Sequence, residues 1–323
     1  MCHLIYTDTF YMKRKWIRWV SWILLTPIIL FVILMVLLYV PPVQNLLRRE
    51  VTAYASKATG MQIQVERIDL RFPLNLLVRG VEVIQQPDTL LSLESLNVRV
   101  QAWPLIKGKV EVDEVTLSRV AVNSADLMEG MNIKGVLGRF FLQSHGVDLS
   151  NELAVINQVE LSDTHVQLLM NDTTTTPKDT TASAPINWKV ALHQLKLKNV
   201  SFSMQLPADS MRMAAHIGEA AIDDAQADLK NQYYDLKKFL LSGTSVSYDT
   251  GTAQPAEGFD ASHIAVRDIR IALDSLLYKG RDMNAVIREF TMNERSGLSV
   301  TSLTGRAYSN DSVICVPGLK LNT

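Results

Sequence analysis

The sequence is poor in cysteine, with only Cys2 and Cys315 among its 323 residues. A long apolar run separates the two, and if that run crosses a membrane they cannot pair within one chain. A disulfide-stapled fold is therefore excluded, so burial and strand pairing must hold the chain together. Cys315 stands between Ile314 and Val316, which is typical of a packed thiol rather than a nucleophile.

The chain also lacks an excess of charge of either sign, because its formal net charge is −1. Binding to nucleic acid requires a basic face that neutralises phosphates. We therefore expect no nucleic-acid partner.

Residue patterns that carry catalysis or metal binding are missing as well. No Gly-rich phosphate loop or nucleophile-elbow pattern occurs. Asp223 and Asp224 are adjacent, and because strand neighbours point to opposite faces, they predict a solvated turn rather than a carboxylate site. The histidines lack the paired spacing of a metal site; they are His3, His145, His165, His193, His216 and His263. We expect no enzyme, no cofactor and no metal, and His193 simply in water.

A long hydrophobic run is present near the N-terminus. Residues 19–40 contain no charged side chain, and as a helix they would span about 33 Å, enough to cross a bilayer. A secretory signal peptide would have a shorter apolar core and a small-residue cleavage site, but Pro41-Pro42 follows instead. A buried core helix is rarely apolar all round for this length. The run therefore predicts an uncleaved membrane anchor.

The residues around this run predict its orientation. Aromatic residues that favour the headgroup level lie towards its two ends: Trp16, Trp19, Trp22 and Tyr39. Four basic residues precede it, against Arg48 and Arg49 after it: Lys13, Arg14, Lys15 and Arg18. The positive-inside rule then keeps residues 1–18 in the cytoplasm and exports everything from Pro41 onwards. Met12 opens the basic cluster, so residues 1–11 are consistent with an upstream start site.

A short amphipathic helix is predicted directly after the anchor. Pro41 and Pro42 suit a first helical turn, and Gly60 suits a left-handed C-terminal cap. Apolar residues recur between them at helical spacing: Val43, Leu46, Leu47, Val51, Tyr54, Ala55 and Ala58. This helix would lie on the bilayer or cover the end of the following domain, and the second is the commoner fate.

From Met61 the apolar period changes from helical to two, interrupted by steps of three. Period two places one face of a strand on an apolar surface, and a single slip would reverse the faces. A step of three keeps the phase if one residue bulges there, which also bends the strand. We expect one apolar, curved surface that includes Ile68, Leu70, Val98, Val100, Val110, Val112, Val115, Leu117, Leu195 and Leu197. Glu111, Thr116, Arg99 and Lys196 are expected to face water.

Three stretches interrupt this rhythm. Residues 124–150 break the alternation and predict a short helix containing Leu137, Phe140 and Phe141. Residues 171–185 are Thr-rich and polar, which predicts a flexible loop. Residues 226–241 are ambiguous between helix and strand, and Tyr233 and Tyr234 favour the strand.

The basic-flanked anchor, the helix ending at Gly60, the Gly80-Val81-Glu82-Val83 strand and the Leu105–Gly108 turn resemble the N-terminal end of TamB-type proteins. These belong to the AsmA-like group of Gram-negative envelope proteins. The match is best over residues 16–122, and its motifs are degenerate hydrophobic patterns. The resemblance implies a single-pass inner-membrane protein with a long periplasmic β-rich body and an apolar groove. It also implies a role in outer-membrane assembly or phospholipid traffic, and an outer-membrane partner of the Omp85 or TamA type.

The expected fold is thus mainly β: a cytoplasmic tail (1–18), a transmembrane helix (19–40), an amphipathic helix (41–60) and a curved, taco-like open groove (61–323). Two functions remain open, a groove that shields phospholipid acyl chains or an unfolded client, and a membrane-tethered scaffold with a closed core. Family members are usually far longer, and this sequence stops within a strand-like alternation. We therefore expect a fragment of a longer assembly.

Overall fold

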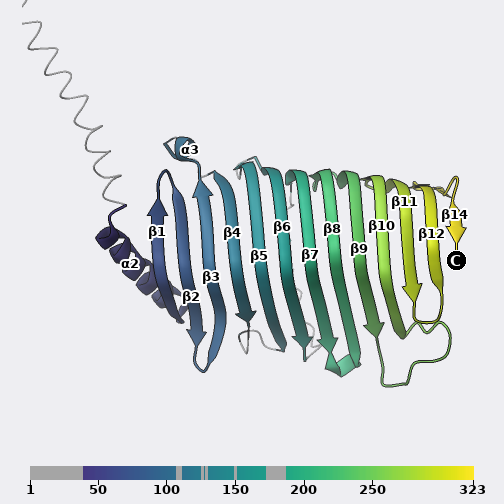
Figure 1. Cartoon of the computed structure of the whole chain (residues 1–323), viewed down its shortest axis with the longest axis horizontal. Coiled ribbons are helices and arrows are strands. Elements are labelled where there is room, and N and C mark those ends of the chain that lie inside the picture. Colours follow the sequence, from purple (N-terminus) through teal and green to yellow (C-terminus); the bar gives the residue numbers. More distant parts are fainter. Residues whose placement is uncertain (1–38, 107–110, 125–126, 128–129, 149–150, 172–186) are drawn as a thin grey trace, which may run out of the picture.

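A single β-sheet dominates the computed structural model, which describes residues 39–106, 111–124, 127, 130–148, 151–171 and 187–323. The sheet has 14 strands and is open, since its first and last strands do not pair (Figure 1). Within these described residues, two α-helices accompany it, α2 (Pro41–Thr59) and the short α3 (Ala102–Ile106). The mainly β class expected from the alternation is confirmed.

The strands follow one another along the chain in the order in which they lie in the sheet. Their bounds are β1 Gln62–Arg71, β2 Asn75–Gln85, β3 Asp88–Val100, β4 Val112–Asn123, β5 Met131–Asp148, β6 Leu153–Met170, β7 Lys189–Leu206, β8 Met211–Asp228, β9 Tyr233–Asp249, β10 His263–Lys279, β11 Asp282–Glu294, β12 Ser299–Ser309, β13 Ile314–Cys315 and β14 Lys320–Asn322. A 3₁₀ turn, η1 (Pro207–Asp209), joins β7 and β8. Neighbouring strands are antiparallel except β6 and β7, which run parallel from the pair Leu153–Lys189.

Helix α2 confirms the helix predicted after the apolar run. Pro41 and Pro42 occupy its first positions, where a missing N–H costs nothing. Gly60 ends it with φ 71° and donates its N–H to the Ser56 carbonyl at 3.0 Å. The left-handed backbone that this cap requires is available to glycine without a Cβ clash.

Helix α2 covers the outer edge of β1, the second of the two positions considered for it (Figure 1). Gln44 Nε2 donates to the Leu70 carbonyl at 2.9 Å, and Arg48 donates to the Glu66 carbonyl at 2.6 Å. The Ile63 N–H donates to Ser56 Oγ at 3.1 Å. These side chains, four or eight positions apart, form one polar stripe that satisfies backbone groups of an edge strand.

A row of left-handed residues crosses the sheet near the middle of its strands. Its members with positive φ are Gly80, Arg119, Asp163, Asn199, Gly243 and Asp268. Each falls within a step of three, as Asn199 does between Leu197 and Val200. In the pairs β3–β4, β5–β6 and β7–β8 the neighbouring strands carry their extra residue at the same level, so the ladder keeps its register there. In β10 the register shifts between Val266 and Ile269. We call this row the crease.

Side chains along the crease are small or paired. Asn199 Nδ2 donates to Asp163 Oδ1 at 2.8 Å, and Arg119 pairs with Glu94. At Gly218 an added Cβ would lie 2.8 Å from the backbone oxygen of Gly243. Glycine is thus required at this crossing by the close approach of two backbones.

A second row of irregular backbone crosses the sheet at the other level where the apolar spacing widens from two residues to three. The register shifts between Arg99 and Val100 in β3 and between Gln143 and Ser144 in β5. In β8, Asp224 adopts φ 55°. Asp223 and Asp224 therefore lie inside a strand rather than in the predicted turn, since the left-handed Asp224 absorbs the extra residue.

The helix predicted within 124–150 is wrong, because Met131–Asp148 forms strand β5. Ile133, Leu137 and Phe140 keep the strand rhythm, but Gly135 fills an apolar position and Phe141 a polar one, which hides it. The preference for strand over 226–241 is confirmed on both sides of the turn between β8 and β9. The expected loop 171–185 lies outside the described residues after Asn171.

Candidate functional site

Apolar side chains form continuous rows across the whole sheet. Directly paired residues lie on the same face, so the cross-strand partners define each row. The first apolar row consists of Ile68, Val78, Leu96, Leu117, Phe140, Leu161, Leu197, Ala220, Leu241, Ile271, Phe290, Leu303 and Leu321. No member is polar, although the row crosses from β1 to β14.

A second apolar row lies two residues away on the same face. It consists of Leu70, Leu76, Val98, Val115, Leu142, Val159, Leu195, Ile222, Phe239, Leu273 and Ile287. Both rows lie between the crease and the second irregular row. We call the surface formed by these two rows and their same-face neighbours the apolar face.

The structure brings the predicted surface residues together in adjacent rows. Ile68, Leu117 and Leu197 belong to the first apolar row. Leu70, Val98, Val115 and Leu195 belong to the second. Val100 and Val112 pair with each other in the next row, whereas Val110 lies outside the described residues.

The apolar face is only half-buried. Each of the nine described candidates falls between buried and exposed. The described hydrophobic residues that are buried are mostly small or isolated: Leu90, Leu93, Ala154, Ala220, Ala272, Ala285 and Val300. Within the described ranges, no large side chain is fully buried, whereas a closed core would bury several.

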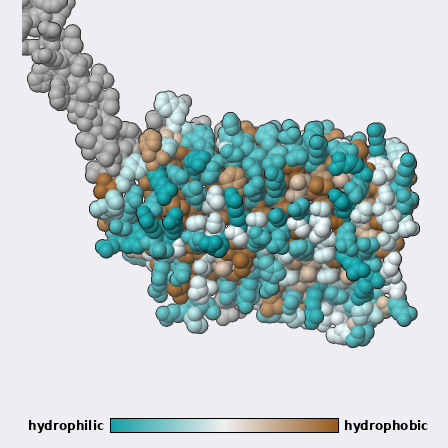
Figure 2. All heavy atoms as spheres, viewed as in Figure 1, coloured by the Kyte–Doolittle hydropathy of each residue, from teal (hydrophilic) through white to brown (hydrophobic). Residues whose placement is uncertain are grey.

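The opposite face, which we call the polar face, carries the charged pairs. Arg99 and Glu114 pair at 3.1 Å, and Lys196 and Glu160 at 4.0 Å. Thr116 pairs with Phe141 on this face, so it is not uniformly polar. Figure 2 shows one side of the molecule, on which hydrophilic side chains predominate.

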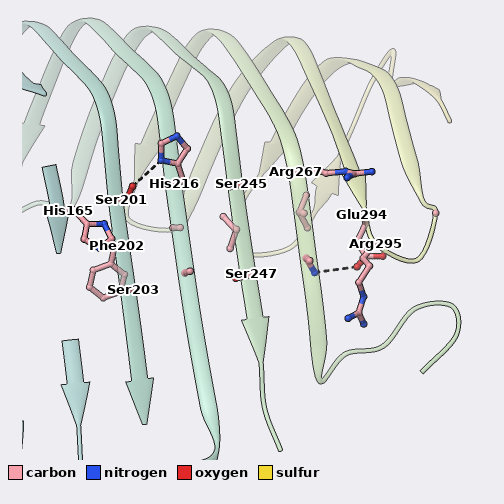
Figure 3. Close-up of a pocket in the computed structure, with 16 residues that line it drawn as sticks. His165, Ser201, Phe202, Ser203, His216, Ser245, Ser247, Arg267, Glu294 and Arg295 are labelled. Atoms are coloured by element: carbon pink, nitrogen blue, oxygen red, sulfur yellow. Dashed lines mark hydrogen bonds between the residues drawn. The ribbon is translucent and has the colours of Figure 1, made fainter. Parts of the chain in front are cut away.

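A pocket of about 500 Å³ lies across β6–β11 (Figure 3). Two adjacent rows of the polar face line most of it: His165, Ser201, His216, Ser245 and Arg267, then Ser203, Ala214, Ser247, Ala265 and Arg295. Phe202 and Glu294 also line it. Small side chains at its centre leave the hollow. The sequence gives a weak sign of it in the alternation of serines at 201 and 203 and at 245 and 247.

The pocket contains a serine–histidine pair. Ser201 Oγ lies 3.0 Å from His216 Nδ1. Among the described residues no carboxylate bonds to His216, so the pair lacks the third group that orients a catalytic base. The two arginines at the margin, Arg267 and Arg295, are exposed and point in different directions in Figure 3.

Three further groups of titratable residues pair locally. His193 Nδ1 lies 3.0 Å from Asp224 Oδ1, with both side chains mostly exposed. Asp260 accepts hydrogen bonds from the backbone N–H groups of Ala256 and Ser262 and bonds to His263, and these contacts lower its pKa to about 2. Cys315 lies beside Tyr308 and raises the pKa of that phenol through their hydrogen bond. The described residues contain no cluster of potential metal ligands.

The predicted membrane-facing residues fall mostly outside the described part of the chain. Lys13, Arg14, Lys15, Arg18, Trp16, Trp19 and Trp22 lie there, as does the run 19–38. Tyr39 is described: its hydroxyl donates to the Pro73 carbonyl at 2.7 Å. No helix in the described part is long and apolar enough to span a bilayer.

No protein-family model matches this chain, and no curated protein matches it either. The likeness to TamB-type proteins therefore rests on the residues that suggested it.

Proposed function

We propose that the chain is a membrane-anchored protein of the bacterial envelope whose apolar face shelters phospholipid acyl chains, or an unfolded outer-membrane client, in the periplasm. The single observation that carries this proposal is the pair of unbroken apolar rows that cross the sheet and, apart from Ala220, are not buried. Each methylene group that such a surface covers contributes about 0.8 kcal/mol. A lipid chain lying along the rows would therefore bind without any specific polar contact.

The crease supports a trough rather than a flat sheet. Left-handed residues such as Asp163 and Asn199 change the strand direction at one level in neighbouring strands. Figure 3 shows neighbouring strands arching together at their upper ends. In the proposed trough, the two apolar rows form the floor and the polar face lies outside.

The resemblance to TamB-type proteins supports the setting: an inner-membrane anchor over residues 19–40, a periplasmic body, a role in outer-membrane biogenesis and an outer-membrane partner of the TamA type. The alternative is a membrane-tethered scaffold in which the apolar face is an ordinary closed core. The half-burial of residues such as Leu117 and Leu197 favours the trough over that alternative.

Site-specific photo-crosslinking tests the proposal. A photoreactive amino acid replaces Leu117 on the apolar face or, as the matched control, the adjacent Thr116 on the polar face. The full chain is irradiated in cells labelled with radioactive phosphate, then purified. We expect labelled phospholipid, or an outer-membrane protein, on the Leu117 variant alone. Equal crosslinking at both positions, or none at either in a folded protein, would contradict the shelter and favour the scaffold.

A further inference from the structure

Helix α2 has a second side that the sheet does not use. Its polar stripe, Gln44, Arg48 and Ser56, bonds to β1. Leu46 and Tyr54, on the side of the helix away from that stripe, are 58% and 77% exposed, and Val51, between the two sides, is 53% exposed. An amphipathic helix normally buries its apolar side, so this arrangement is reversed.

An exposed aromatic ring from the sheet lies near the start of the same helix. Phe72, in the β1–β2 turn, is 86% exposed. Its ring centroid lies 6.5 Å from that of Tyr39, and the Tyr39 hydroxyl bonds to the adjacent Pro73 carbonyl. These contacts hold the turn beside the point where the described chain begins.

The position of Tyr39 indicates what covers this surface. Tyr39 is the penultimate residue of the charge-free run 19–40. If that run spans a bilayer, Tyr39 lies at the exit interface, and a ring centred 6.5 Å away must lie at a similar depth. Exposed aliphatic and aromatic side chains are stabilised in this interface, where one end is apolar and the other wet.

We propose that the outward side of α2, formed by Leu46 and Tyr54 with Val51 at its margin, lies together with Phe72 in the periplasmic interface of the bilayer that holds the anchor. Glu50 and Lys57 lie on the same side, and their charged ends reach the headgroups. This inference rests on the anchor of the proposed function. It adds that α2 joins two surfaces, the membrane and the edge of β1.

The arrangement orients the trough. Since α2 lies beside β1 at one end of the sheet (Figure 1), docking of α2 on the bilayer makes the sheet extend away from the membrane strand by strand. The apolar rows then begin at Ile68 and Leu70, the members closest to the bilayer. Leu70 is two residues from Phe72, so the apolar face starts beside the bilayer interface.

Spin-label depth measurements on the full chain in phospholipid vesicles test this. The native cysteines are replaced (Cys2→Ser, Cys315→Ser), and single labels are placed by Leu46→Cys, Tyr54→Cys and Phe72→Cys in separate proteins. Asn45→Cys, next to Leu46 on the other side of α2, and Phe259→Cys, in the β9–β10 loop and 68% exposed, are aqueous controls. Leu30→Cys reports on the anchor.

We expect the three test labels about 5–10 Å into the headgroup and acyl boundary, with both controls fully accessible to a water-soluble nickel reagent. All three replaced side chains are exposed, so the variants should fold. If the Leu30 label lies in hydrocarbon but any test label is as accessible as the controls, the docking proposal is overturned and the anchor stands. If the Leu30 label is itself aqueous, both the proposed membrane anchor and the proposed docking of α2 are contradicted.

Discussion

The apolar face and the polar face are made by alternate residues of the same strands, yet they differ in continuity. The first apolar row crosses from Ile68 to Leu321 without a polar member. The polar face alternates ion pairs, small residues and an occasional ring such as Phe141. The apolar face thus offers one continuous hydrophobic surface, whereas the polar face meets water and pairs locally.

The largest expected difference between the two faces comes from placing a negative charge on each of them in turn. We expect Leu117→Asp to destabilise the protein by about 2–4 kcal/mol, because a half-buried apolar contact is lost and a carboxylate enters an apolar row. Thr116→Asp, one residue away, should change the free energy of unfolding by less than about 1 kcal/mol. Urea denaturation measures both. Equal losses would show that our assignment of the faces is wrong.

The crease can be broken at Gly218. We expect Gly218→Val to cost about 1–3 kcal/mol, because its Cβ would lie 2.8 Å from the Gly243 carbonyl oxygen. Gly135→Ala is the matched control in a neighbouring part of the sheet, since its Cβ would meet nothing closer than 3.5 Å. Thermal unfolding measures the two. A tolerated valine would mean that the strands do not need their close approach.

The edge of β1 that α2 covers can be used to test whether side chains of a helix satisfy the backbone groups that a neighbouring strand would otherwise pair. Ser56→Ala removes the acceptor for the Ile63 N–H, and we expect a loss of about 1 kcal/mol. Ser56→Thr keeps a hydroxyl acceptor and should behave as the parent protein. Hydrogen exchange at the Ile63 amide reports the change locally. Unaltered protection in the alanine variant would show that α2 covers β1 without this bond.

The smallest effect we predict concerns pH and the β9–β10 loop on which Asp260 lies. The pKa of Asp260 is lowered from 3.8 to about 2, chiefly by the Ala256 N–H and His263. The ionised carboxylate therefore stabilises the loop fully above about pH 4, and that stabilisation is lost as the pH falls towards 2. Thermal unfolding of the parent protein and Asp260→Asn should converge over this range. A constant difference between them would contradict it.

Much of the apolar face follows from the sequence, because steps of two and three are visible in single strands. Leu195, Leu197 and Val200 indicate both the face and the place of the extra residue. Strand β5 could not be predicted in this way, since Gly135 occupies an apolar position and Phe141 a polar one. The pocket on the polar face has no strong sequence signal, because serine and alanine are common on any solvated strand. The reversed sides of α2 were not predicted, because periodicity shows which residues share a side but not what that side meets.

The parallel pairing of β6 and β7 has a consequence for how register is chosen. Between antiparallel neighbours a short turn limits the alignments that a growing chain can sample. No such turn sets the alignment of Leu153 with Lys189, so side chains must select it. A slip of two residues would still place Val159 opposite an apolar partner, Leu197, but it would place Leu161 opposite Asn199. It would also separate Asp163 from Asn199, which bond at 2.8 Å. The match of the apolar rows and the Asp163–Asn199 bond therefore both favour the observed register at this parallel pair.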